Sequence, residues 1–350
     1  MAGKVIRGLD SAELSSFCSQ VALILSAGLP LYDGMETLAE TTKGSEYAEL
    51  YESCSKAVTE TGSLYQALQR DNRWPSYLVE MTGIGEQTGQ LEKVMNGLSD
   101  YYAREDRIRS SIIGAVTYPL VLGVMLVLII AIMLWKVLPV FQRVLNSMGA
   151  ELSASGSALM RVGSTIGWVV LALVALVVVV VLVGAIMLKT SARDKVLGVV
   201  RRLFPPVRNL SMKLASSRVA SVLSMMLSSG FPTNEAFRLL PSVLSNDEAS
   251  DKVQGIRKEL DEGAAFADAI SHSKLFDGLH DRMIRMGVAA GREDQVMAKI
   301  ADLYEEQVEE GIARLVAIIE PTLIALLAVV IGAVLLSVML PMAGILSSML

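Results

Sequence analysis

The sequence predicts an all-α integral membrane protein with two homologous cytoplasmic helical bundles and three transmembrane helices. Three long apolar blocks predict the membrane helices, because the 350 residues are 52% hydrophobic and most of the excess lies in these blocks. Motifs that occur twice at one spacing predict the two bundles. Outside the blocks the alternating pattern typical of strands is missing, so helices are expected throughout.

The apolar blocks cover residues 112–138, 166–188 and 318–346. Each reaches the roughly 20 apolar residues that a helix needs to cross the hydrocarbon core. A helix is the expected form because it pairs its own backbone groups where water is absent. Trp135 and Trp168 lie at the outer ends of the first two blocks, where aromatic side chains anchor a helix at the membrane interface.

Basic residues indicate the direction of the spans. They cluster before the first span and after the second, at Arg104, Arg107, Arg109, Lys189, Arg193, Lys195, Arg201, Arg202, Arg208 and Lys213. Since basic flanks stay in the cytoplasm, the bundles at 1–111 and 189–317 are predicted to be cytoplasmic. The loop at 139–165 and the C-terminus are predicted to face outward. The polar N-terminus predicts a cytoplasmic start without a cleaved signal.

Motifs of the first bundle recur 202 residues later. Leu25–Pro30 (LSAGLP) matches Leu227–Pro232 (LSSGFP). The matched pairs are Gly28 with Gly230, Pro30 with Pro232, Gly85 with Gly287, Gly89 with Gly291, Tyr102 with Tyr304, and Pro119 with Pro321. One offset held over so much of the chain indicates an internal repeat. The span at 166–188 has no counterpart and is predicted to return the chain to the cytoplasm, so that both copies have one orientation.

Local signals predict where the helices of each bundle begin and end. Asp10 with Glu13 resembles a capping box at the start of the first helix. Gly28 is expected to end this helix in a left-handed conformation, with Pro30 following closely. For the Gly-x-x-x-Gly pairs, Gly85 with Gly89 and its repeat, two interpretations stay open. Either the glycines let another backbone approach a helix face, or they supply the unusual angles of a turn.

At these residues the sequence resembles the type II secretion F / PilC family. Gly85–Leu91 (GEQTGQL) is similar to the family signature Gly-Glu-x-Ser/Thr-Gly-x-Leu, and Ile319-Glu320-Pro321 is similar to a second signature. Leu25–Pro30 fits the helix-loop-helix start of the family, and the resemblance covers about residues 10–345. Two departures from the family are noted: Val288 stands where the first copy has Glu86, and the chain is expected to lack the strand-like N-terminal extension of many relatives.

The resemblance implies a non-enzymatic platform protein of the bacterial inner membrane, in type II secretion or type IV pilus assembly. Its implied partners are a cytoplasmic hexameric secretion or pilus ATPase, pilin or pseudopilin subunits, other inner-membrane assembly proteins and further copies of the chain. Membrane lipid surrounds the spans. The net charge of −5 gives no indication of nucleic-acid binding. The choice between a pilus and a secretion pseudopilus stays open.

Motifs for chemistry are missing from the sequence. It has no phosphate-binding loop, no His-Glu-x-x-His and no Gly-x-Ser-x-Gly, so neither an enzyme nor a cofactor is predicted. The two cysteines, Cys18 and Cys54, are expected to be packed free thiols, and metal ligation is not predicted. His272 and His280 are expected at the surface.

Two acidic residues are candidates for a functional role. Glu86 is either a solvated helix residue or a charge near a helix start, or it is a contact or, as a weak candidate, a cation ligand between bundles. Glu320 lies at the cytoplasmic end of a span, where it either forms an interfacial salt bridge with Arg314 or has a function. Tyr118 takes the place of Glu320 in the first copy. The acidic run at Glu305, Glu306, Glu309 and Glu310 is expected to be solvated.

Two alternative functions belong to other classes. A small transporter would place ionisable or broken-helix positions deep in the membrane, yet the interiors of the first two spans carry no charge. A membrane-bound sensor would need a signalling domain that the sequence does not indicate. The platform protein is therefore the preferred interpretation.

Overall fold

The computed structural model describes residues 9–137, 205–244 and 246–349, with a few separate positions between 139 and 175. The secondary structure within these ranges is helical, and they contain no strand. The all-α class is therefore confirmed. The predicted span at 166–188 lies almost entirely outside the described residues.

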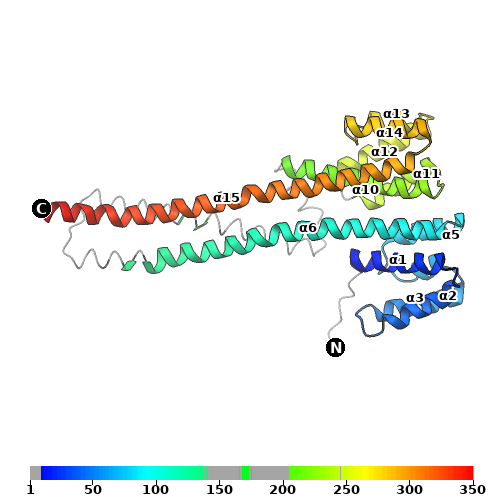
Figure 1. The fold of residues 1–350 in the computed structure, drawn as a ribbon, viewed down its shortest axis with the longest axis horizontal. Helices are drawn as coiled ribbons and strands as arrows, with labels where there is room; N and C mark the ends of the chain where they lie inside the picture. Colours follow the sequence, from blue (N-terminus) through cyan, green and yellow to red (C-terminus); the bar gives the residue numbers. More distant parts are fainter. Residues whose placement is uncertain are drawn as a thin grey trace. The chain divides into compact units, whose positions relative to one another are not determined.

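The first half of the chain forms consecutive helices that end in a long one (Figure 1). They are α1 (Ser11–Ser26), α2 (Leu31–Thr41), α3 (Ala48–Thr61), α4 (Leu64–Gln69), α5 (Ser76–Thr88) and α6 (Leu91–Ile132), and α6 continues into a π-helical turn, Met133–Val137. Asp10 caps α1 by accepting from the backbone N–H of Glu13 at 2.9 Å. The Glu13 carboxylate accepts from the Tyr51 hydroxyl instead of completing a capping box.

The second half follows the same order (Figure 1). Its helices are α10 (Pro205–Ser228), α11 (Thr233–Val243), α12 (Asp247–Asp261), α13 (Phe266–Ser273), α14 (Gly278–Ala290) and α15 (Glu293–Met349). Equivalent side chains make equivalent bonds in the two halves. The Ser15 hydroxyl donates to the Ser99 carbonyl at 2.9 Å, and the Ser217 hydroxyl donates to the Ala301 carbonyl at 3.1 Å. Each bond ties the first helix of a half to its last.

The described helices fall into two compact units. The first unit comprises Met1–Ser110 and Phe204–Glu309, and the second comprises Ser111–Leu203 and Glu310–Leu350. The sequence predicted a separate bundle for each half. In the first unit, buried residues of both halves share one continuous core. Contacts between the two halves account for this shared core.

The core of the first unit is rich in aromatic side chains. The Phe17 ring lies 5.6 Å from the Tyr51 ring and 4.6 Å from the Trp74 ring, centroid to centroid. In the second half the His280 ring packs 4.4 Å from the Tyr304 ring and is only 1% exposed. The surface prediction for His280 is therefore wrong. The periodicity of α14 turns this position toward the core, where an aromatic neighbour covers the imidazole.

The second unit contains the apolar parts of α6 and α15. The helices Leu91–Val137 and Glu293–Gly332 are long and apolar enough to cross a membrane. Within this unit Leu126, Ile130 and Val330 form a small buried cluster. Many other large apolar side chains are exposed along both helices, including Val121, Met125, Leu128, Ile324, Val329 and Leu336. Such continuous apolar surface suits a lipid environment better than water.

Cys18 and Cys54 are free and buried in the first unit. Burial raises the pKa of the Cys18 thiol, and it raises the pKa of the Cys54 thiol to about 12. Because the thiolate is the reactive form, we expect both thiols to resist maleimide at pH 8 in the folded protein and to react fully after denaturation. Labelling of the native protein followed by mass spectrometry checks this, and rapid native labelling of either cysteine would contradict the packing.

Candidate functional site

Both interpretations of the Gly-x-x-x-Gly pairs apply. The first glycine of each pair allows close approach of a neighbouring helix, and the second supplies the unusual backbone angles of a turn. A Cβ atom at Gly85 would lie 3.0 Å from the Leu91 Cα, and one at Gly287 would lie 2.6 Å from the Val296 side chain. The first glycine therefore allows close packing of the next helix. The second glycine is a left-handed cap, with φ of +67° at Gly89 and +64° at Gly291.

The loop motifs also repeat in the structure. Gly28 and Gly230 have φ of +67° and +70° and end α1 and α10. Pro30 and Pro232 occupy the N-cap positions of α2 and α11. Glycine is favoured at such helix ends because other residues are strained in the left-handed region.

Glu86 caps the short helix α4. Its carboxylate accepts from the Ser63 hydroxyl at 2.6 Å and from the backbone N–H groups of Leu64 at 2.6 Å and Tyr65 at 3.2 Å. These backbone groups belong to the first turn of α4, where no intrahelical acceptor is available. Both oxygens of Glu86 are thus hydrogen-bonded at the start of a helix.

The second copy lacks this polar cap, because the residues at all three positions are different. Ala265, Ala267 and Val288 stand where the first copy has Ser63, Tyr65 and Glu86. The N-cap of α13 at Ala265 accordingly has no side-chain hydrogen bond. An ion pair from Arg285 to Asp268, at 2.8 Å, joins α14 to α13 instead. The replacement of Glu86 by Val288 is therefore accompanied by substitutions at two positions of the helix start that Glu86 caps in the first copy.

Ion pairs join the two halves of the first unit. Arg104 lies 3.0 Å from Asp302 and 2.7 Å from Glu305, and Arg107 lies 2.9 Å from Glu305. The hydrogen bond to Glu305 raises the pKa of the Arg107 guanidinium, against the effect of burial. Glu305 is only 8% exposed, so the prediction of a solvated acidic face is wrong for this residue. Two arginines from α6 cover it.

A second pair, which is partly buried, joins α6 to α10. The Arg218 guanidinium donates to both oxygens of Glu105, with 2.6 Å between Nη2 and Oε2. Burial is the largest single influence and acts to lower the pKa of Arg218, but the hydrogen bond to Glu105 and the negative charge of its carboxylate together raise the pKa. Sequence reasoning missed both ion-pair clusters, because their partners are far apart in the chain and carry no motif.

In the second unit the structure brings Tyr118 and Glu320 together. The Tyr118 hydroxyl lies 3.4 Å from the Glu320 carboxylate, and the two positions are equivalent in the repeat. Pro119 and Pro321 follow them inside α6 and α15. The predicted partner of Glu320, Arg314, pairs with Glu310 at 3.0 Å instead. Residues six apart lie on different faces of a helix, whereas residues four apart are neighbours.

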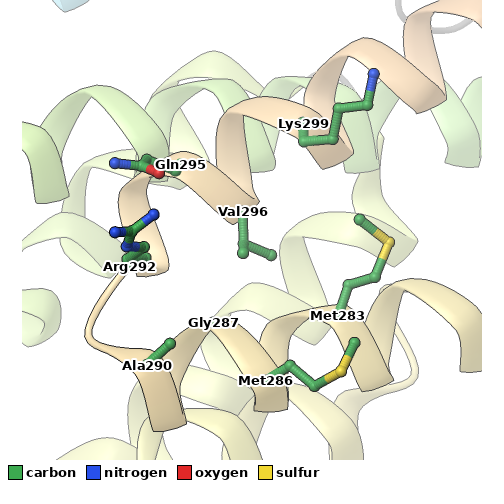
Figure 2. A pocket seen from close by; sticks show the side chains of 8 residues that line it. All are labelled: Met283, Met286, Gly287, Ala290, Arg292, Gln295, Val296 and Lys299. Carbon is green, nitrogen blue, oxygen red and sulfur yellow. The ribbon is translucent and has the colours of Figure 1, made fainter.

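A surface hollow lies between α14 and the start of α15 (Figure 2). It has a volume of about 300 Å³ and is lined by Met283, Met286, Gly287, Ala290, Arg292, Gln295, Val296 and Lys299. Figure 2 shows Val296 between the two methionines of α14 and the polar side chains of α15. The described residues contain no group of three or more His, Cys, Asp or Glu that could hold a metal ion.

The family comparison matches the chain twice. The model described as "Type II secretion system (T2SS), protein F" matches residues 17–139 and again residues 219–341. Both matches start and end at positions separated by the spacing of the glycine and proline pairs. Two matched copies, helices throughout the described residues and two long apolar helices together define the class of this protein. The chain belongs to the type II secretion F / PilC family.

Curated relatives match over nearly the whole chain. Type IV pilus assembly protein PilC of Thermus thermophilus is 26% identical over 344 residues, covering 98% of this chain and 85% of the relative. PilC of Pseudomonas aeruginosa is 26% identical over 352 residues, with coverage of 97% and 91%. Type II secretion system protein F of Aeromonas hydrophila is 26% identical over 336 residues, with coverage of 96% and 87%. Relatives from pilus assembly and from secretion are thus equally similar.

Proposed function

We propose that this chain is a non-enzymatic platform protein of a type II secretion or type IV pilus machine in the bacterial inner membrane. It couples a cytoplasmic hexameric ATPase to the insertion or extraction of pilin-like subunits. The observation that carries the proposal is the double family match, because each of the two matches includes one of the long apolar helices. Relatives named for pilus assembly and for secretion support the same class of machine.

The proposed architecture has two homologous helical bundles in the cytoplasm and three membrane spans. The N-terminus is cytoplasmic, the loop at 139–165 and the C-terminus face outward, and the protein acts with further copies of itself. The equivalent hydrogen bonds and glycine caps of the two halves support the duplication. Basic flanks support the orientation.

The proposed work of the protein is mechanical. The ion pairs of Glu305 and Glu105 tie the two halves of the first unit, so a partner that pushes one half moves the other. α6 and α15 both begin in the first unit and end in the second. A hydrogen-bonded helix resists changes in its length, which suits the transfer of motion toward the membrane.

Purification of the full chain in detergent or nanodiscs tests this function. We expect no ATP hydrolysis by the chain alone, because it lacks a phosphate-binding loop. We expect its cognate hexameric ATPase to co-purify with it, while an unrelated hexameric ATPase does not. A cognate ATPase that fails to bind under native conditions, or binds no better than the unrelated one, would overturn the proposal.

A further inference from the structure

The two halves of the first unit meet through surfaces that are not equivalent. Met225 of α10 packs on Gly97 of α6, where a Cβ atom would collide with its side chain. Met225 is only 5% exposed, and α11 contacts α5 next to it. The second half therefore covers the α5–α6 face of the first half with its own α10–α11 corner.

The repeat shows which surfaces this contact leaves open. Leu23 of α1 is the equivalent of Met225, and it is 68% exposed. Met286 of α14 is the equivalent of Ile84 of α5, and it is 65% exposed, whereas Ile84 packs against the core. The first half thus keeps an uncovered corner at α1–α2. The second half keeps an uncovered face at α14–α15, which holds the hollow of Figure 2.

We propose that copies of this chain associate head to tail, with the α1–α2 corner of one copy docked on the α14–α15 face of the next. The docked corner presents Leu23, Leu29 and Tyr32, which are all large, apolar and exposed. The receiving face presents Met286 and the hollow. The contact between copies is equivalent to the contact that already joins the two halves within one chain. The partner that docks on the α14–α15 face is therefore a second copy. A contact of two different surfaces continues until a ring closes or a filament forms.

The charges beside the two surfaces support docking of the α1–α2 corner on the α14–α15 face. They also indicate how tight the contact between copies is. Arg292 and Lys299 border the hollow, and α2 carries the exposed acidic residues Asp33 and Glu36 beside the docking corner. Lys299 replaces Gly97 at the centre of the contact. Its long side chain must move aside before an apolar side chain can dock, so the contact between copies is looser than the internal one.

This inference rests on the proposed function only for the shared membrane orientation of all copies. Both halves are proposed to precede an outgoing span. If the operation that relates the two halves is repeated from one copy to the next, each added copy keeps the same orientation in the bilayer.

Disulfide trapping between two differently tagged copies tests the contact. One full-length copy carries Leu23→Cys and the other carries Lys299→Cys, and both are expressed together in membranes. Gly97→Cys with Met225→Cys in a single chain serves as the internal reference, because a Cβ at Gly97 would lie 3.1 Å from the Met225 Cβ. Leu23→Cys paired with Lys258→Cys, at a highly exposed position of α12, is the matched control.

We expect the Leu23→Cys and Lys299→Cys copies to form a mixed disulfide at several-fold higher yield than either variant forms with itself or than the control pair forms. The buried native cysteines leave little background. Two outcomes overturn the inference when the internal reference disulfide forms: no mixed disulfide, or a preference for pairing of identical variants. ATPase binding is measured on the same membranes, so a failure of docking with retained ATPase binding overturns the head-to-tail contact alone.

Discussion

Replacement of Arg218 by glutamate is expected to destabilise the first unit by about 3 kcal/mol or more. The change removes the partner of Glu105 and places two carboxylates opposite each other at the junction of α6 and α10. Both native side chains are less than one-fifth exposed, so water screens the repulsion poorly. Denaturant unfolding of the full chain in detergent, followed by circular dichroism, measures the loss.

The reversed pair separates this interaction from a general effect of charge. Glu105→Arg alone is expected to destabilise the unit similarly, and the double variant with Arg218→Glu should recover most of the loss. Reversal of the exposed pair of Arg257 and Asp261 on α12 is the matched control and should change the free energy of unfolding by less than about 1 kcal/mol. Losses that simply add in the double variant would show that Arg218 and Glu105 are not coupled.

Replacement of Glu86 by alanine is expected to cost about 2 kcal/mol of folding free energy. It leaves the first N–H groups of α4 and the Ser63 hydroxyl without their acceptor. Glu86→Gln should lose about half as much, because its amide oxygen still accepts. The same unfolding measurement applies.

Glu80 on the same helix supplies the control for this prediction. It is exposed, so Glu80→Ala should change stability by no more than about 0.5 kcal/mol. If Glu86→Ala and Glu80→Ala prove equally mild, the cap of α4 contributes little. If Glu86→Ala leaves stability unchanged but abolishes ATPase binding, Glu86 is a contact residue rather than a cap.

Much of the local structure of this protein follows from short stretches of sequence. Gly28 and Gly89 end helices because glycine accepts a left-handed backbone, and Pro30 stands at the N-cap of the next helix, where its missing N–H breaks no helical hydrogen bond. The lengths of the apolar blocks predict the long helices at α6 and α15. These features depend on residues within a few positions of one another, so they can be predicted without knowledge of the tertiary contacts.

The interactions of the acidic residues could not be predicted in this way. Glu305 and Glu306 are adjacent in the sequence, yet only Glu305 is buried against Arg104 and Arg107. Glu86 was a candidate for contact, and its hydrogen-bond partners lie more than twenty positions earlier in the chain. Each outcome depends on which helix packs beside the residue.

The amino-acid sequence alone predicts two matched copies, helices in place of strands, and long apolar segments. These signals lie in short or strictly periodic stretches of sequence, so they do not depend on contacts with distant residues. Three-dimensional packing was needed to see that the two halves share one core, that Arg218 pairs with Glu105, and that the α14–α15 face is left uncovered. The physical reason is that burial and ion pairing depend on packing between residues as much as 201 positions apart.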